Sequence, residues 1–221
     1  KGSTSGVQGL KIGWTPDFGF AKVESEVRSI CEKAAKSFEL LGCNVEDSDF
    51  EIEDPFFPWL TLFSTASLAM NAEYWPDRAR EMTDYVKETY EIAGCLSAVD
   101  FSKGVANIQT IRTALNRQFE RFDLLISPTM AVPPYDCGSP PRAVDGYDVD
   151  GSWACLPFTY PINSAGYPAA SIPAGMTEKG LPVGLHIIGK FGDEETIIRA
   201  SAAFESANPW ANLYPEISLN L

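Results

Sequence analysis

The sequence is poor in the residues from which many metal and hydrolytic sites are built. It has one histidine, His186, and its five cysteines are scattered, with no Cys-x-x-Cys pair. A structural zinc site takes four closely spaced ligands, and a Ser-His-Asp triad needs its histidine beside a nucleophile motif. The sequence therefore predicts no metal site, and reduced thiols are the default expectation.

Long apolar runs and an excess of basic charge are also lacking. No stretch approaches the roughly 20 apolar residues that a membrane span needs. The chain has 17 basic and 30 acidic residues, a formal net charge of −13, which disfavours nucleic acid and anionic membrane surfaces as partners. We therefore expect no nucleic acid, no membrane and a cytoplasmic location.

Residues 10–47 have the pattern of a β-α-β unit. Residues 10–14 form a short apolar strand, and residues 23–41 carry apolar side chains at helical spacing. Gly42 is a fitting helix stop before a second strand at 43–45. The turn after the first strand lacks the glycines of a Gly-x-Gly-x-x-Gly loop, so a dinucleotide site is rejected.

The middle of the chain is expected to be mainly helical. Residues 56–94 are rich in aromatic side chains, and Pro76 breaks or begins a helix near their middle. An aromatic stripe of this kind is more often core than ligand pocket. Residues 105–122 predict a second long helix, followed by a buried strand at 123–127. Residues 136–152 predict a long exposed loop.

Residues 153–190 are dense in glycine and proline, yet their apolar runs are those of buried strands. Proline fixes φ and removes a donor, and glycine permits positive φ, so the backbone path is specified turn by turn. Residues 181–188 read as a strand entered from a turn at Gly180. Segments of this kind usually wrap a pocket or cross beneath one.

Four blocks together resemble the C-terminal half of the amidase signature family. They are LKIGWTPDFGFAKVESEVRSICEKAAKSFELLGCNVED (10–47), FERFDLLISPTM (119–130), PFTYPINSAGYPAASIPAG (157–175) and GLPVGLHIIGK (180–190). The resemblance implies an α/β fold, with a mixed, twisted sheet flanked by helices, of which residues 1–221 are the C-terminal portion. Within it we expect the β-α-β unit at 10–47, a variable helical region at 56–105, and a strand and loop core at 106–205.

Enzymes of this family hydrolyse amide bonds with a Ser–cis-Ser–Lys triad in their N-terminal half, where the serines lie in a Gly-Gly-Ser-Ser-Gly stretch. This sequence has no such stretch, and its nearest imitation, KGSTSG at 1–6, has neither the spacing nor the context. The resemblance thus implies an amidase that converts a carboxamide to a carboxylic acid and ammonia or an amine, without metal or organic cofactor. No catalytic residue is expected in this chain, which would supply scaffold and part of the substrate pocket.

The expected partners are a small-molecule amide and the missing N-terminal half of the enzyme, with a homodimer left open. Two other functions also remain open. One is the A subunit of a glutamine-dependent tRNA amidotransferase. The other is a catalytically inactive relative that serves as a scaffold.

Carried over residue by residue, the resemblance names Met130, Trp153 and Leu156 as candidate substrate-binding residues, against the alternative of ordinary packing. In the amidotransferase A subunits it suggests an acidic residue at the position of Leu156, which holds the substrate's α-ammonium. A leucine has no acceptor, and a buried unpaired ammonium would be strongly unfavourable. An apolar or aromatic acyl part is therefore expected, with Trp153 as a flat wall.

Three polar residues have a functional and a structural interpretation. Arg112 lies where some relatives pair with a substrate carboxylate, but a surface or interhelical ion pair is favoured. For His186, a hydrogen-bonded core position is favoured over a thiol hydrolase built with Cys155 or Cys137. Thr159, like Asn163, is expected to satisfy buried backbone groups.

Six acidic residues lie between positions 46 and 54. They lack the ligand spacing of an EF-hand calcium loop. The sequence therefore predicts a solvated loop there.

Overall fold

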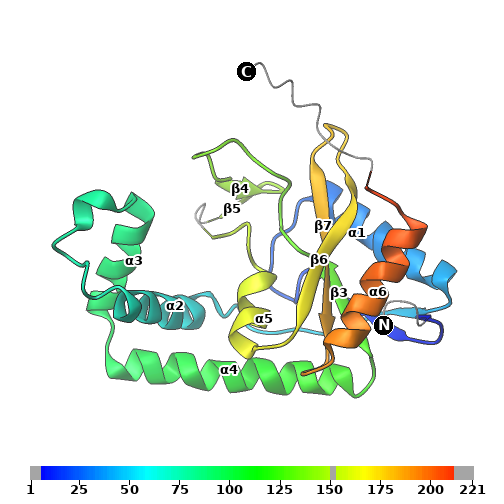
Figure 1. Cartoon of the computed structure of the whole chain (residues 1–221), viewed down its shortest axis with the longest axis horizontal. Helices are drawn as coiled ribbons and strands as arrows, with labels where there is room; N and C mark the ends of the chain where they lie inside the picture. The colour runs from blue at the N-terminus through cyan, green and yellow to red at the C-terminus, as the bar shows by residue number, and fades with distance from the viewer. Residues whose placement is uncertain (1–5, 150–152, 212–221) are drawn as a thin grey trace.

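A five-stranded mixed sheet lies at the centre of the computed structural model, which describes residues 6–149 and 153–211 (Figure 1). The strands are β1 (Lys11–Trp14), β2 (Asn44–Asp47), β3 (Leu124–Pro128), β6 (Ala169–Met176) and β7 (Pro182–Gly189). Their order is β2-β1-β3-β7-β6. β1 runs parallel to β2 and β3, whereas β7 is antiparallel to both β3 and β6. The α/β class and the mixed sheet expected from the sequence are confirmed.

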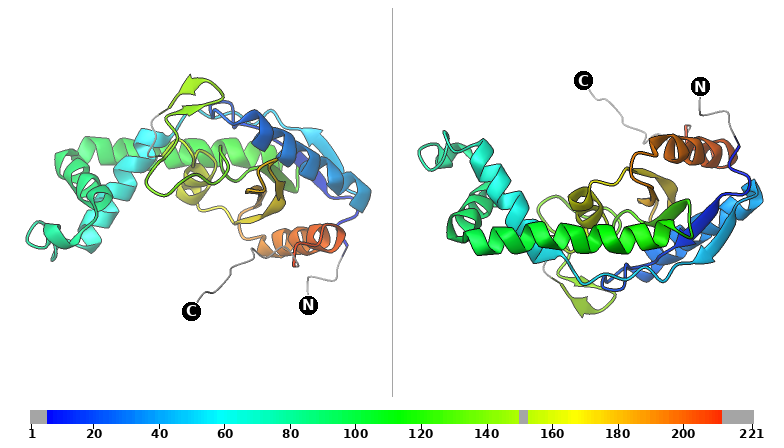
Figure 2. Two further views of the ribbon diagram at one scale, coloured as in Figure 1. Left: turned by 90° about the horizontal axis from the view of Figure 1, so that it is seen from above. Right: turned by 90° about the horizontal axis from the view of Figure 1, so that it is seen from below.

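Helices cover both faces of this sheet. They are α1 (Ser25–Ser37), α2 (Phe56–Met70), α3 (Asp84–Cys95), α4 (Ala98–Phe119), α5 (Thr159–Ala165) and α6 (Glu194–Ala207), with 3-10 turns η2 (Phe38–Leu41) and η3 (Ala79–Glu81). α1 and α6 pack on the strands from one side, while α5 packs on α4 and α2. α2 and α3 project away from the sheet at the start of α4 (Figure 2). Within the described residues, no helix is both long and apolar enough to cross a membrane.

The β-α-β unit over residues 10–47 is confirmed. β1 and β2 are parallel neighbours, and α1, whose buried face carries Val27, Cys31, Ala34 and Ala35, packs on β3, β6 and β7. The chain then turns at Gly42, whose φ of 84° is left-handed. Glycine adopts this conformation without strain, which explains the helix stop that the sequence predicted.

Helix α4 begins at Ala98, seven residues before the predicted start of 105. Ser97 and Asp100 form a capping box, in which Asp100 N donates to Ser97 Oγ at 3.2 Å and Ser97 N donates to Asp100 Oδ2 at 3.0 Å. These bonds satisfy backbone donors that the helix start leaves unpaired. The part of α4 before residue 105 buries only Gly104. The spacing of apolar residues in the sequence therefore did not reveal it.

The region 56–94 is mainly helical and divides near Pro76, as expected. α2 ends at Met70, before Pro76, and α3 follows. α2 buries the small residues Thr61 and Ser64 and exposes Met70. Gly104 of α4 fits beneath this helix, because an added Cβ would lie 3.0 Å from Leu62 Cγ. Small residues therefore let α2 and α4 pack closely.

The predicted loop at 136–152 contains a hairpin, β4 (Ala143–Val144) and β5 (Tyr147–Asp148). Asp145 and Gly146 both have positive φ, 51° and 82°, as a two-residue hairpin turn with matching twist requires. Val144 is fully buried, so the expectation of an exposed loop is wrong there. The end of the predicted loop, 150–152, lies outside the described residues.

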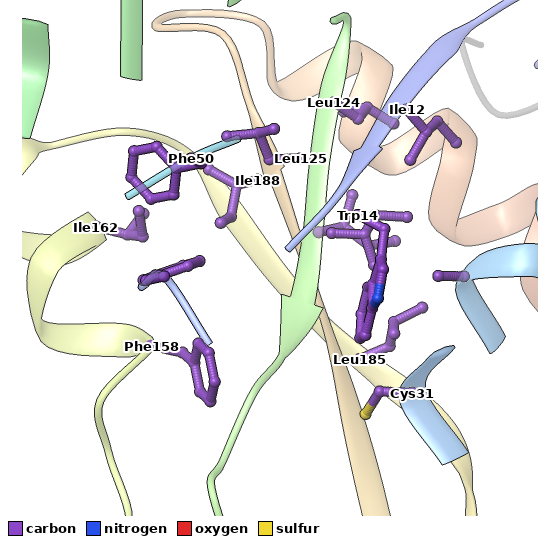
Figure 3. Close-up of a cluster of buried hydrophobic side chains, with 14 of the residues drawn as sticks. Ile12, Trp14, Cys31, Phe50, Leu124, Leu125, Phe158, Ile162, Leu185 and Ile188 are labelled. Atoms are coloured by element: carbon purple, nitrogen blue, oxygen red, sulfur yellow. The ribbon is translucent and has the colours of Figure 1, made fainter. Parts of the chain in front are cut away.

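Side chains that alternate along the central strands fill the core on both sides of the sheet (Figure 3). Ile12 and Leu124 point to one side, whereas Leu125 and Ile188 point to the other, toward Phe50 and Ile162 of the loop and helix that cover it. Successive residues of a strand face opposite sides. All five residues of β3 (LLISP) are buried, which is why its first three residues, Leu124 to Ile126, form an unbroken apolar run.

Candidate functional site

A cavity of about 190 Å³ lies among the segments that follow β1 and β2 and the stretch between the β4–β5 hairpin and α5. We call it the aromatic cavity, because its walls include Phe20, Phe56, Trp153 and Tyr160, with Lys22 and Asp54 as its charged members. In open α/β sheets, ligands bind beyond the carboxyl ends of the parallel strands, where these loops gather. The position of the cavity therefore fits a binding site.

The aromatic walls belong to a larger cluster that joins α2, α5 and Trp153. Trp59 stacks on Tyr160 with ring centres 5.2 Å apart and meets Trp153 edge-on at 4.9 Å. Phe63 also stacks on Trp59, with ring centres 5.0 Å apart. These offset and edge arrangements are the favoured ones for aromatic pairs. The aromatic residues of α2 thus support the cavity wall rather than a separate helical core.

One carboxylate organises the polar side of the aromatic cavity. Tyr160 Oη donates to Asp54 Oδ1 at 2.8 Å, and Phe56 N donates to the same oxygen at 3.0 Å. Burial, followed by the negative charge of Asp54, raises the pKa of Tyr160 above its usual range, so the phenol keeps its proton and donates. The Lys22 ammonium lies 4.7 Å from the centre of the Tyr147 ring.

Two of the three candidate substrate-binding residues line separate cavities in the described part of the chain. Trp153 lines the aromatic cavity, and Met130 lines a second cavity of about 130 Å³ with Tyr135 and Val183. Leu156 borders neither of these two; it is half-buried and packs against the core. A substrate-binding role for each of the three remains a prediction.

Arg112 joins two helices through a backbone hydrogen bond rather than through an ion pair. Its Nε donates to the carbonyl oxygen of Ala165, the last residue of α5, at 2.9 Å. A cation at the end of a helix meets carbonyls that have no partner within the helix. The expected interhelical contact is present, but its acceptor is a carbonyl instead of a carboxylate.

His186 is a buried core residue, as predicted. Its Nδ1 lies 3.5 Å from Ser127 Oγ on the neighbouring strand, and burial lowers its pKa to about 4. The imidazole is therefore neutral near pH 7. Cys155 instead contacts Tyr135 Oη at 3.5 Å, and Cys137 is exposed, so the described contacts assemble no Cys-His pair.

The two polar residues near α5 behave differently. Thr159 Oγ1 donates to the carbonyl oxygen of Leu156 at 3.2 Å, which confirms its expected role. Asn163 is exposed, and the prediction for its side chain is wrong; its backbone carbonyl accepts from Gly166 N. The helical turn that ends at Gly166 turns this side chain to solvent.

The acidic run at 46–54 is mostly exposed, as expected, and no group of residues suited to a metal ion occurs in the described part of the chain. Two exposed members of the run nevertheless bind side chains of other elements: Asp54 accepts from Tyr160 Oη, and Asp49 accepts from Gln118 Nε2. Sequence reasoning missed Phe20, Asp54 and Tyr160 as cavity residues. The aromatic density near Trp59 was the one signal, and it did not indicate that Asp54 would pair with Tyr160, 106 positions away.

Comparison with known proteins agrees with this fold. A family model described as Amidase matches residues 2–198. The chain therefore belongs to the amidase family, and the resemblance found in its sequence is confirmed.

Similar proteins include an acylamidase of Rhodococcus erythropolis, 29% identical over 98% of this chain and 46% of its own length. The A subunit of the glutamyl-tRNA(Gln) amidotransferase from Thermodesulfovibrio yellowstonii is 27% identical over 95% of this chain and 47% of its own. The crystal structure of a bacterial aryl acylamidase of the amidase signature family superposes with a TM-score of 0.83 at 31% identity, over 95% of this chain and 46% of that one. The chain thus spans about half the length of these relatives.

Proposed function

We propose that this chain is the C-terminal portion of an amidase domain that hydrolyses a carboxamide C–N bond to a carboxylic acid and ammonia or an amine. Family membership supports this reaction, and a coverage of 46% of the acylamidase supports a second half of the enzyme. The N-terminal half would supply the nucleophile and its base. Residues 1–221 would supply scaffold and part of the substrate pocket.

The aromatic cavity carries the proposal for the substrate. The rings of Phe56, Trp153 and Tyr160 offer flat apolar surfaces, and a ring packed against such a surface gains about 0.5–1.5 kcal/mol beyond its buried area. Amides with an aromatic group therefore fit this cavity best. The likeness to a bacterial aryl acylamidase at 31% identity supports the same class.

The A subunit of a tRNA amidotransferase is the second candidate, because several similar proteins carry that name. Leu156 argues against it: the side chain packs against the core and has no acceptor for a substrate ammonium.

A glutaminase assay of the whole protein separates the two candidates. Release of ammonia from glutamine, with none from aromatic amides, would favour the amidotransferase.

The test compares anilides with short aliphatic amides as substrates of the whole enzyme. Trp153→Ala should lower kcat/KM for anilides by about tenfold and for aliphatic amides much less, because it removes one wall of an apolar pocket. Trp153→Phe keeps a flat ring and is the matched control. Equal losses on both substrates would contradict the aromatic pocket, and a wild-type enzyme inert toward every amide would contradict the amidase function.

A cytoplasmic location is part of the same proposal. All five cysteines are unpaired, two of them exposed, as is usual in a reducing compartment.

The proposed ligand is a small-molecule amide. A homodimer of the whole enzyme remains open.

A further inference from the structure

Trp153 is a wall of the aromatic cavity that no helix or strand carries. It lies in a turn between β5 and α5 and is only partly buried. Side chains on loops are positioned less precisely by their own backbone than side chains on helices and strands. The place of the indole ring therefore depends on the rings that pack against it.

α2 supplies two of these rings. Trp59 and Phe63 stack on each other with ring planes 16° apart. The indole of Trp153 meets both at a steep angle, 71° to Trp59 and 73° to Phe63, with ring centres 4.9 Å and 5.9 Å away. Edge-on contacts of this kind are favoured between aromatic rings. α2 thus fixes one edge of the wall.

α3 supplies a third ring, from a residue that does not line the aromatic cavity. Tyr85, in the first turn of α3, lies with its ring centre 5.4 Å from that of Trp153. α3 packs mainly on α2, in the part of the molecule that projects from the sheet (Figure 1). Through Tyr85 this projecting part reaches the stretch that leads into α5.

The contact between Tyr85 and Trp153 bears on how well the cavity binds a ring. A wall that is already in place costs a ligand less free energy than a wall that must be ordered during binding. Removal of the Tyr85 ring would leave the indole supported from α2 alone. Tyr85 is 46% exposed, so a substitution there should leave the core packed.

We propose that Tyr85 is a specificity-determining residue of the amidase, because it holds the Trp153 ring where that ring forms a wall for an aromatic substrate. The inference rests on the proposed function, since it needs an aromatic group in the aromatic cavity. Tyr85 touches the wall and not the substrate, so it is a positioning residue. α3 would in this way control which amides the enzyme prefers.

Steady-state kinetics of the whole enzyme test this role. Tyr85→Ala should raise KM for acetanilide about three- to tenfold, as expected for one ring contact, and leave kcat within about twofold of wild type. Butyramide has no ring to place against the wall, so its KM should stay the same. Tyr85→Phe keeps the ring and should behave as wild type with both substrates.

Two further variants separate this contact from a general disturbance of α3. Ile92→Ala shortens another partly exposed side chain of the same helix and should leave KM for acetanilide unchanged. Tyr85→Ala combined with Trp153→Ala should raise KM no more than Trp153→Ala alone, because Tyr85 acts through Trp153.

Binding of aniline separates this inference from the proposed function. Aniline has the aromatic ring but no amide bond, so its affinity for the whole enzyme does not depend on hydrolysis. Tyr85→Ala should raise its Kd, measured by calorimetry, about three- to tenfold, and Tyr85→Phe should not. This result in a protein that hydrolyses no amide would refute the proposed function and leave the role of Tyr85 standing.

Four outcomes would overturn the inference. No binding of aniline to the wild-type enzyme would mean that the wall has no ring to meet. An unchanged KM for acetanilide in Tyr85→Ala would show that Trp153 needs no support from α3. Equal rises in KM for acetanilide and butyramide would show a general disturbance. Effects of Tyr85→Ala and Trp153→Ala that multiply in the double variant would show that the two residues act independently.

Discussion

Tyr160 Oη donates a hydrogen bond of 2.8 Å to Asp54 Oδ1, which joins residues 106 positions apart. The bond ties α5 to the loop that enters α2, where Asp54 also accepts from Phe56 N. It thereby holds the rings of Tyr160 and Phe56 with their centres 6.1 Å apart. The shape of the aromatic cavity depends on this contact.

Tyr160→Phe should lower the free energy of unfolding by about 1.5 kcal/mol, because a hydrogen bond to a carboxylate is lost while the ring remains. Urea unfolding measures the change. Tyr147→Phe is the matched control, since that ring is 58% exposed, and it should have no measurable effect. An equal effect of both substitutions would show that the Tyr160 bond adds nothing to stability.

Leu156→Asp should alter substrate preference while the protein stays folded. A carboxylate at this position would favour amides that carry an ammonium group and disfavour apolar acyl groups. Relative kcat/KM across a panel of acyl groups measures the effect, with Leu156→Met as a control of similar volume. Unchanged kinetics across the panel in a folded Leu156→Asp enzyme would remove Leu156 from the pocket.

His186 should make stability depend on pH below neutrality. Burial lowers its pKa from 6.5 to about 4, so below pH 6.5 the unfolded chain binds a proton that the folded chain does not. The free energy of unfolding should therefore fall as the pH falls from about 6.5 to about 4, by about 3 kcal/mol in all, and then level off.

The measurement for His186 is the difference between wild type and His186→Gln, because carboxylates titrate in the same range. The glutamine cannot gain a proton, so its unfolding free energy should lack the part of the slope that the histidine contributes. Parallel curves for the two proteins between pH 4 and 6.5 would contradict the burial of a neutral imidazole.

Gly184→Ala should destabilise the protein by about 1–3 kcal/mol, because the new methyl group would press on Ser171 Oγ and Thr129 Oγ1. Ser171→Ala in the same chain should recover part of the loss by removing one of these atoms. Gly94→Ala is the control: nothing lies within 4 Å of its Cβ position, and α3 should not be destabilised. Strictly additive effects of the Gly184 and Ser171 substitutions would contradict the contact.

Local patterns in the sequence were sufficient for much of the sheet. The spacing of apolar residues and Gly42 defined the β-α-β unit, and DLLIS defined β3. An element that is buried on one face or throughout needs apolar residues at matching positions, and these positions can be recognised in the sequence. The start of α4 escaped this reasoning. Its first turns are held by the Ser97–Asp100 capping box rather than by a buried face.

The family blocks and the buried His186 could also be inferred from the sequence alone, since each depends on residues within one segment or on one strand. The aromatic cavity could not. Asp54, Trp59, Trp153 and Tyr160 come from separate elements, and only the packing of α5 against α2 brings them together. A sequence records how strongly each position prefers burial, whereas contacts between distant positions depend on how the completed elements pack.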